Sequence, residues 1–344
     1  MDEWNFLKYD SSLEETLNKF KKAAKVHKKV RKNFRTLIDS GEIKGMKYFD
    51  IANHIEGLIE KESKFVVKDP FKSGIGFPIG LSINECAAHW TPNPGEKRTL
   101  KKSDLVKVDY GVHYDGCIID SAFTFSLDDK YDELIKIGKS ATQIAIKNSG
   151  VDAILGEIGA ETQEFIESHE VEIDGKVHQV KSVKDLTGHM IFPYMIHASK
   201  SVPNIKINYP VRMEENEFYA IETFPTTGNG KTTVDMECSH YMINTDKIID
   251  EIKENKKPPK LDTRENFLFK KIRDTRQTLP FCKKWLKNYE IKGYQIPLNS
   301  LVKKGVVNSY PPIMSQKDSL VVQFEHTIFV GPKSVNVLSK GDDY

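Results

Sequence analysis

The chain has 344 residues, with 51 lysines and arginines against 49 aspartates and glutamates, so its formal net charge is only +2. This near balance gives no reason to expect DNA binding. No apolar run is long enough for a transmembrane helix, and the acidic start Met1-Asp2-Glu3-Trp4 does not resemble a secretory or mitochondrial leader. The 4 cysteines lie far apart and form no CxxC pair, which favours free thiols in a reducing compartment. We therefore expect a cytoplasmic globular protein with no membrane partner.

Two amphipathic helices are predicted at the start of the chain. Apolar residues recur at helical spacing over 12–38, and a second helix is predicted over 46–63. The first helix carries many lysines, which would suit a nucleic-acid or ribosome patch. Acidic residues within and just beyond that helix instead favour an ordinary solvated face.

Residues 105–125 are typical of a tight hairpin. Asp115-Gly116 is a strong signal for a two-residue turn, which would place Asp109 opposite Ala122 and diagonal to Asp120. A turn one residue earlier would oppose the two aspartates directly, and either register puts both carboxylates on one face. Because like charges this close repel, a cation is expected between them. The hairpin alone leaves two interpretations open: a metal centre, or a surface turn with solvated aspartates.

The remaining chain repeats an order of helices followed by strands. Helices are predicted near 130–149 and 158–168, broken by Gly150 and Gly156. The repeated order suggests two similar halves, although no residue-level repeat is visible. Residues 245–305 are lysine-rich and helical, and we interpret them as an insertion in a strand-rich half. Strand-like runs lie near 177–182, 207–212, 217–224, 231–243 and 320–330.

Four segments beyond the hairpin place a histidine or glutamate in apolar, strand-like surroundings. A lone histidine there is usually a satisfied core residue, but an unpaired buried glutamate is very costly. Together with the hairpin aspartates, one of these histidines and both glutamates make a coherent ligand set. Four carboxylates and one imidazole suit two divalent ions, and oxygen-rich ligands favour Mn²⁺, Fe²⁺ or Co²⁺. The four residues are His89, His189, Glu222 and Glu325.

The sequences around the five ligand candidates resemble the metal ligands of the methionine aminopeptidases, in peptidase family M24. They are Lys-Val-Asp-Tyr-Gly at Asp109, Ile-Ile-Asp-Ser-Ala at Asp120, Thr-Gly-His at His189, Ala-Ile-Glu-Thr-Phe at Glu222 and Gln-Phe-Glu-His-Thr at Glu325. The resemblance is closest to the eukaryotic type 2 enzymes and runs from about residue 10 to 344. Further signatures are Cys-Ala-Ala-His-Trp from Cys86, Asp-Met-Glu-Cys-Ser-His-Tyr from Asp235, Tyr-Pro-Pro from Tyr310 and Gly-Asp-Asp-Tyr from Gly341.

This resemblance implies a fold and a domain division. The fold is α/β (α+β) and pita-bread, with a pseudo-twofold central antiparallel sheet flanked by helices. Residues 1–244 and 306–344 would form the catalytic domain. Residues 245–305 would be the helical insertion that distinguishes type 2 from the shorter type 1 enzymes.

The resemblance also implies roles for the ligands. Asp109 would chelate one metal, His189 and Glu222 the other, and Asp120 and Glu325 would bridge both. The ions would be Mn²⁺, Co²⁺ or Fe²⁺, with Zn²⁺ as a further candidate. A water acidified by two cations would attack the carbonyl after the initiator methionine, and Glu222 would shuttle the proton.

The substrate would be a nascent polypeptide with a small second residue, while ribosome association stays open. His197 would polarise the substrate carbonyl. His89 would contact the scissile amide and react with fumagillin-type epoxide inhibitors. Apart from the resemblance, Phe77 and Ile196 would be ordinary core residues and Tyr310 a turn aromatic. The walls of the methionine pocket would be Phe77, Ile196, His240 and Tyr310.

Two departures from the type 2 pattern affect the pocket rim. The loop Met190-Ile-Phe-Pro-Tyr194 is bulkier and stiffer than usual, and Ser199 stands where glycine is usual.

Two other functions compete with methionine removal. One is a non-catalytic pita-bread homologue that binds RNA, the ribosome or a protein; the other is an Xaa-Pro aminopeptidase or prolidase. The first is disfavoured because no metal ligand is lost.

Overall fold

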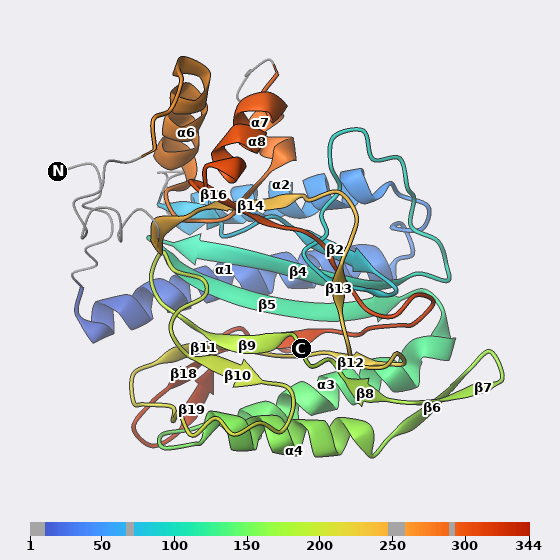
Figure 1. Ribbon diagram of the computed structural model, residues 1–344. Coiled ribbons are helices and arrows are strands. Elements are labelled where there is room, and N and C mark those ends of the chain that lie inside the picture. The colour runs from blue at the N-terminus through green and yellow to red at the C-terminus, as the bar shows by residue number, and fades with distance from the viewer. Residues whose placement is uncertain (1–10, 67–71, 247–258, 289–292) are drawn as a thin grey trace.

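Helix pairs covering antiparallel strands form the body of the protein in the computed structural model (Figure 1). The structure describes residues 11–66, 72–246, 259–288 and 293–344. None of the helices in these ranges combines the length and apolar character that a membrane span requires. The mixed α/β class expected from the sequence is confirmed.

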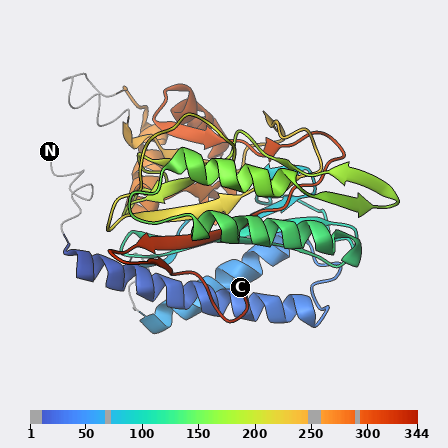
Figure 2. The same ribbon diagram turned by 90° about the horizontal axis from the view of Figure 1, so that it is seen from below.

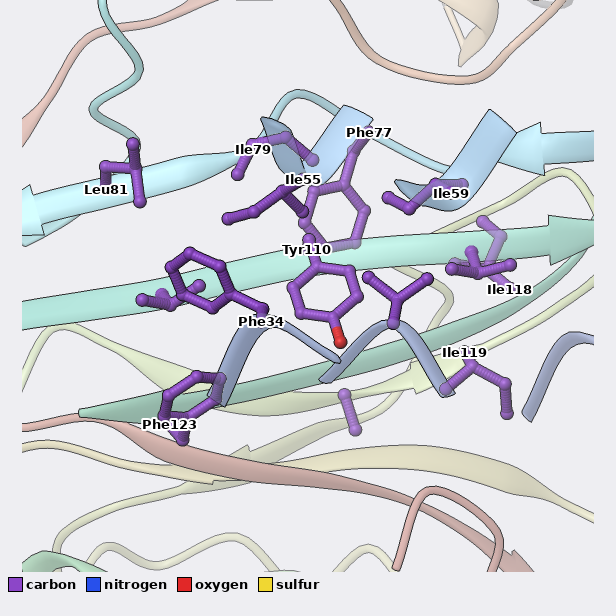
Figure 3. Packing of buried hydrophobic residues seen from close by; sticks show 14 of the residues in the cluster. Phe34, Ile55, Ile59, Phe77, Ile79, Leu81, Tyr110, Ile118, Ile119 and Phe123 are labelled. Atoms are coloured by element: carbon purple, nitrogen blue, oxygen red, sulfur yellow. The ribbon is translucent and has the colours of Figure 1, made fainter. Parts of the chain in front are cut away.

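The first half consists of helices α1 (Leu13–Asp39) and α2 (Tyr48–Val66) on a four-stranded sheet. Ser12 caps α1, because its side chain accepts a hydrogen bond from the Glu15 amide at 3.2 Å. Apolar side chains of both helices pack against the sheet, as Phe34 of α1 and Ile55 of α2 do beside Tyr110 of the sheet in Figure 3. The predicted helices over 12–38 and 46–63 are thus confirmed within a few residues. The strands are β1 (Ser73–Ile75), β2 (Gly80–Ile83), β4 (Leu105–Tyr114) and β5 (Cys117–Ser126).

Strands β4 and β5 form the predicted hairpin with the two-residue turn. Asp109 pairs with Ala122, and Gly111 pairs with Asp120, so the two aspartates are diagonal neighbours rather than directly opposed. Asp115 and Gly116 have φ values of 48° and 79°, as a type I′ turn requires. The turn chemistry therefore decides between the two registers that the sequence left open.

The second half repeats the arrangement with helices α3 (Asp132–Lys147) and α4 (Leu155–Glu167). In Figure 2 these two green helices lie side by side, and the blue helix α1 lies below them in the view. Their sheet has the order β10-β9-β11-β18-β19. The strands are β9 (Thr187–Ile191), β10 (Ser201–Pro203), β11 (Phe218–Thr223), β18 (Phe324–Val330) and β19 (Val335–Val337).

Two predictions in this half were wrong. Gly156 does not break a helix but lies in the first turn of α4, where a Cβ atom would come within 2.7 Å of the Ile207 carbonyl oxygen. Residues 207–212 do not form a strand. Their carbonyls instead accept hydrogen bonds from the first amides of α4, Leu155 to Val211 at 2.9 Å and Gly156 to Tyr209 at 3.1 Å. Because Gly156 has no side chain, the start of α4 can lie close against the backbone of residues 207–212.

Hydroxyl side chains join the two halves where β5 runs beside β18. Thr327 accepts from the Asp120 amide at 2.8 Å and donates to the Asp120 carbonyl at 2.6 Å. Ser121 donates to the carbonyl of Glu325 at 2.7 Å, and Thr124 donates to that of Gln323 at 2.8 Å. This β5–β18 seam brings Asp120 and Glu325, far apart in the sequence, into the middle of the molecule.

A helical layer follows β14 (His240–Ile243) and surrounds its own apolar cluster, which includes Leu268, Phe281, Leu286 and Leu298. It contains α6 (Thr263–Arg276), β15 (Phe281–Cys282), α7 (Lys283–Asn288) and α8 (Gln295–Lys303), which leads to β16 (Val307–Tyr310). The predicted insertion over 245–305 includes these elements. Its portions 247–258 and 289–292 lie outside the described residues, and the domain division stays a prediction. The shorter strands are β3 (Cys86–Ala88), β6 (Glu170–Ile173), β7 (Lys176–Gln179), β8 (Lys181–Ser182), β12 (Pro225–Thr226), β13 (Thr233–Val234) and β17 (Ile313–Met314).

Candidate metal centre and active site

A cavity of about 360 Å³ opens between the two halves and the helical layer. Every ligand, catalytic and pocket-wall residue predicted from the sequence lines it, although these residues come from seven different strands and three connecting segments of the chain. They are Phe77, His89, Asp109, Asp120, His189, Ile196, His197, Glu222, His240, Tyr310 and Glu325. The fold therefore brings the whole set together, whereas the role of each residue stays a prediction.

The carboxylates come from the central strands of both sheets. Glu222 on β11 and Glu325 on β18 are directly paired in the antiparallel register. Asp120 reaches the same place from β5 across the seam, and Asp109 lies beside it on β4. Like charges opposed on a sheet are destabilising unless something neutralises them. The arrangement therefore calls for a cation or for shared protons.

His189 supplies the imidazole of this cluster. Its Nε2 atom lies 3.6 Å from a carboxylate oxygen of Asp120 and 3.9 Å from one of Glu222. One ligand atom each from Asp120, His189 and Glu325 all lie within 4.8 Å of one another, and all three residues are buried. Three such donors around a common point are a suitable start for a divalent ion site.

The donor set fits a metal on further grounds. Asp109 Oδ1 and Glu325 Oε2 are buried and receive no hydrogen bond from the part of the chain that the structure describes. A buried carboxylate oxygen without a partner is costly, and metal coordination would remove that cost. With oxygen atoms dominating and one neutral imidazole, the set suits first-row divalent ions.

The pKa shifts of the cluster also favour a bound cation. Burial raises the pKa of Asp109 to about 6, against a hydrogen bond from Gln323 that lowers it. Burial and then the charge of neighbouring carboxylates raise the pKa values of Asp120, Glu222 and Glu325 well above their ordinary range. Burial lowers the pKa of His189, which keeps the ring in its neutral, metal-binding form. Without a cation these carboxyl groups would hold protons.

Three further histidines surround the cluster. His89 follows β3 with φ at 63°, a positive value uncommon for residues other than glycine, and burial lowers its pKa to about 4. Its ring centroid lies 5.8 Å from that of His240 and 5.9 Å from that of Tyr310. Ser239 donates to the His89 carbonyl at 3.2 Å and lies 3.0 Å from His240 Nδ1. His197 stands edge-on to His189, with 4.2 Å between centroids.

Apolar residues complete the cavity beside these rings. His240 on β14 is paired with Tyr310 on β16, so both side chains stand on the same face. Phe77 and Ile196 are buried in the wall of the cavity. The lining thus combines charged donors with an aromatic and aliphatic surface, as small-molecule sites commonly do.

Sequence reasoning missed several lining residues. Gln323 donates from Nε2 to Asp109 Oδ2 at 3.1 Å and to Glu222 Oε2 at 3.2 Å, so it links two candidate ligands. Strand alternation could have found it, because Gln323 stands two residues before Glu325 on the same face. The same rule would have found Met242 from His240. Pro280 also lines the cavity, and no local pattern marks it.

Comparisons with known proteins agree with this site. The sequence pattern of metallopeptidase family M24 matches residues 18–257. The chain is 44% identical to methionine aminopeptidase 2 of Schizosaccharomyces pombe over 344 residues, covering 100% of this chain and 75% of the relative. It is also 44% identical to methionine aminopeptidase 2 of Saccharomyces cerevisiae over 347 residues, covering 100% of this chain and 80% of that protein.

Solved structures show the same fold at low sequence identity. Methionine aminopeptidase from Thermotoga maritima aligns with a TM-score of 0.61 and 19% identity, covering 97% of this chain and 98% of the other. A thermophilic Arx1 aligns with a TM-score of 0.74 and 14% identity, covering 98% and 93%. The pita-bread fold expected from the resemblance is confirmed. The chain belongs to metallopeptidase family M24, among the relatives of methionine aminopeptidase 2.

Proposed function

We propose that this protein is a metal-dependent methionyl aminopeptidase. It would remove the initiator methionine from nascent proteins whose second residue is small, in the cytoplasm. The observation that carries the proposal is one cavity that holds both a buried carboxylate–imidazole cluster and an apolar, aromatic wall. The full-length similarity to methionine aminopeptidase 2 supports the same substrate.

The metal would be held by the carboxylates of Asp109, Asp120, Glu222 and Glu325 and by the imidazole of His189. A bound divalent pair supplies Lewis acidity, which lowers the pKa of water and polarises a carbonyl group. The oxygen-rich donors favour Mn²⁺, Fe²⁺ or Co²⁺. Gln323 would orient Asp109 and Glu222, because its amide nitrogen contacts both.

The other polar side chains would act on the substrate directly. Glu222 would accept the proton of the attacking water and pass it to the leaving amine. His197, beside His189, would donate a hydrogen bond to the developing oxyanion. His89 would hold the scissile amide, since its neutral ring can donate one hydrogen bond and accept another.

The apolar wall would receive the methionine side chain. A thioether is flexible and polarisable and packs well against aromatic edges. Phe77, His240 and Tyr310 offer such edges, and Ile196 and Met242 add aliphatic surface. Leucine, branched at Cγ, would pack against these aromatic edges less well.

The test is methionine release by the purified protein, supplied with Mn²⁺ or Co²⁺, from a Met-Gly peptide. A Leu-Gly peptide and an Xaa-Pro peptide are assayed in parallel. We expect rapid release of methionine, weak cleavage of the leucine peptide and none of the Xaa-Pro peptide. Glu222→Gln should lower kcat about 10²-fold or more, because the proton carrier is removed. Glu161→Gln, on the exposed surface of α4, is the matched control and should retain full activity.

No methionine release, or equal turnover of the leucine peptide, would refute the proposal. Preferential cleavage of the Xaa-Pro peptide would instead support a prolidase-like function. Metal analysis separates catalysis from a binding role, because a non-catalytic homologue should retain no stoichiometric divalent ion. A fumagillin-type epoxide provides a further check: it should add covalently to the wild type and not to a His89→Ala variant.

A further inference from the structure

The chain directly after α6 reaches both walls of the cavity. Arg276 is the last residue of α6, and Gln277 then takes a positive φ of 52° with ψ at -116°, which turns the chain sharply. Glutamine seldom adopts this conformation, so the surrounding contacts must hold it. The turn delivers Pro280 to the cavity lining. We call residues 276–280 the α6 turn.

Arg276 fastens the α6 turn to the chain before Phe77. Its Nη2 atom donates to the carbonyls of Ile75 at 2.9 Å and Gly76 at 3.0 Å. The same nitrogen donates to the carbonyl of Pro280 at 3.0 Å, and Nε lies 3.3 Å from that oxygen. One guanidinium therefore joins two cavity-lining segments that are about 200 residues apart in sequence.

The guanidinium is itself held in place. It stacks over the ring of Trp285, with its carbon 4.8 Å from the ring centroid. The indole nitrogen of Trp285 donates to Glu56 on α2 at 2.9 Å. A planar fork of donors with fixed orientation can serve several carbonyls at once, which a lysine ammonium does less well.

Strand β1, which precedes Phe77, lies at the edge of its four-stranded sheet. Among the residues that the structure describes, β1 ends at Ile75 and pairs with β4 alone, and the last bond of this contact runs from the Gly76 amide to the Gly111 carbonyl at 2.8 Å. The Phe77 ring lies directly over Gly111, where an added Cβ atom would come within 2.3 Å of the ring. The ring position therefore follows the backbone at 75–76, which Arg276 holds.

A second contact ties the α6 turn to the opposite wall. The Thr278 hydroxyl donates to the carbonyl of Tyr194, and the Tyr194 amide donates to the Gly116 carbonyl at 2.9 Å. Tyr194 itself has φ at 61° and stands two residues before Ile196. Both apolar walls, at Phe77 and at Ile196, are thus connected to the same short turn.

We propose that Arg276 is a positioning residue that fixes the Phe77 wall and so sets which N-terminal side chain the cavity accepts. The inference rests on the proposed function, because it assigns side-chain selection to that site. Arg276 contacts backbone carbonyls rather than the substrate or the candidate metal ligands. Its loss should therefore widen and loosen the pocket while leaving the metal centre intact.

The test compares Arg276→Gln with the wild type on Met-Gly and norleucine-Gly peptides, and by calorimetric binding of free methionine and norleucine. We expect a KM for the methionine peptide raised about tenfold, a smaller change in kcat, and a loss of about tenfold in preference for methionine. Metal content should be unchanged. Arg276→Lys should recover part of the preference, because it keeps a donor near the carbonyls.

Arg273→Gln is the matched control, since Arg273 lies one turn earlier on α6 and pairs with Asp274 at 3.2 Å. It should behave as the wild type. An Arg276→Gln protein with unchanged methionine preference would overturn the inference and leave the proposed function standing. An equal loss of kcat on all peptides, or loss of metal, would also overturn it. Failure of the wild-type protein to release methionine would instead refute the proposed function.

Discussion

Asp109 and Asp120 share one hairpin but have different surroundings. Asp120 is 4% exposed, belongs to the compact donor group with His189 and Glu325, and is held by Thr327 through its backbone. Asp109 lies outside that group, and one of its oxygens already accepts a hydrogen bond from Gln323. The two carboxylates therefore should not contribute equally to metal binding.

Asparagine substitutions test this difference. If Asp120 bridges two ions, Asp120→Asn should weaken both binding events, whereas Asp109→Asn should weaken chiefly one. Calorimetric titration of the metal-free proteins with Mn²⁺ would resolve the two events. The control is Asp115→Asn at the hairpin tip, where Asp115 pairs with Lys19 at 2.8 Å. Identical loss in the Asp109 and Asp120 variants would contradict the assignment.

Most of the charged residues that line the cavity could be predicted from the sequence. Asp109, Asp120, His189, Glu222 and Glu325 were identified because carboxylates and imidazole in apolar strands need a partner, and because their flanks match a family pattern. His326, next to Glu325, faces the other side of β18, as strand alternation requires, and its ring stacks on that of Tyr344 with 4.1 Å between centroids. Gln323 was missed because an amide carries no charge that signals a site.

Among the secondary-structure elements, two helix glycines have the same residue type but different surroundings, so residue type alone does not predict the effect of replacing them. Gly57 in α2 has no neighbour within 4 Å of an added Cβ atom. Gly159 in α4 would place that atom 2.5 Å from the Ile205 carbonyl oxygen and 2.8 Å from that of Pro203. The first glycine is therefore free of packing constraints, while the second permits close packing of α4.

Alanine at the two sites should have opposite effects on the free energy of unfolding. Gly57→Ala should stabilise the protein by about 1 kcal/mol, from helix propensity alone. Gly159→Ala gains the same propensity but overpacks against backbone, so a net destabilisation of about 1–3 kcal/mol is expected. Urea denaturation followed by circular dichroism would measure both. A stabilised Gly159→Ala variant would show that α4 can shift without cost.

Glu265 couples α6 to α8 within the helical layer. Its carboxylate accepts from Lys304 Nζ at 2.5 Å and Ser300 Oγ at 2.5 Å, and from the Asp262 amide at 2.7 Å in a capping box. These contacts, led by Lys304, lower the pKa of Glu265 to about 2. The ionised form is thus favoured by the fold, so its contribution to stability is present above the ordinary pKa of about 4.5 and is lost as the pH falls toward 2.

Glu265→Gln should therefore lower the melting temperature at pH 7 by roughly 2–4 °C. The difference in melting temperature between the variant and the wild type should shrink as the pH falls from 4.5 toward 3, because Glu265 of the wild type then loses its charge as well. Thermal melts at several pH values would measure it. Glu164→Gln, on the exposed side of α4, is the control and should leave the melting temperature at pH 7 close to that of the wild type. A constant gap would mean that charge plays no part.

Across the whole molecule, the C-terminus is fastened to the first helix. Arg31 of α1 is fully buried and binds both carboxylate oxygens of Asp343 at 2.8 and 2.9 Å, together with the carbonyls of Ser339 and Tyr344. The Tyr344 hydroxyl in turn accepts from the backbone amide of Glu325 at 3.0 Å. Helix α1 and the segment around Tyr344 thus support one candidate metal ligand, Glu325.

Arg31→Met should destabilise the protein by about 3 kcal/mol, because the Asp343 carboxylate and two carbonyls lose their partner. Hydrogen exchange of residues 339–344 should speed up in the same variant. Arg35→Met on the same helix is the control. The guanidinium carbon of Arg35 lies 5.6 Å from the ring centroid of Phe123, and this substitution should destabilise the protein less than Arg31→Met. Unchanged exchange at the C-terminus would contradict the role of Arg31.

Local sequence patterns are enough to predict several elements of this protein, such as the Asp115-Gly116 turn and the helices α1 and α2. The four candidate carboxylate ligands stand out because they lie in apolar strands, whereas the choice of His189 as the fifth ligand rests on the family resemblance. How these residues meet depends on tertiary contacts. The ligands lie on separate strands, and their meeting depends on the β5–β18 seam, the close approach of α4 and the α6 turn. Such contacts join residues far apart in the chain, so no local pattern encodes them.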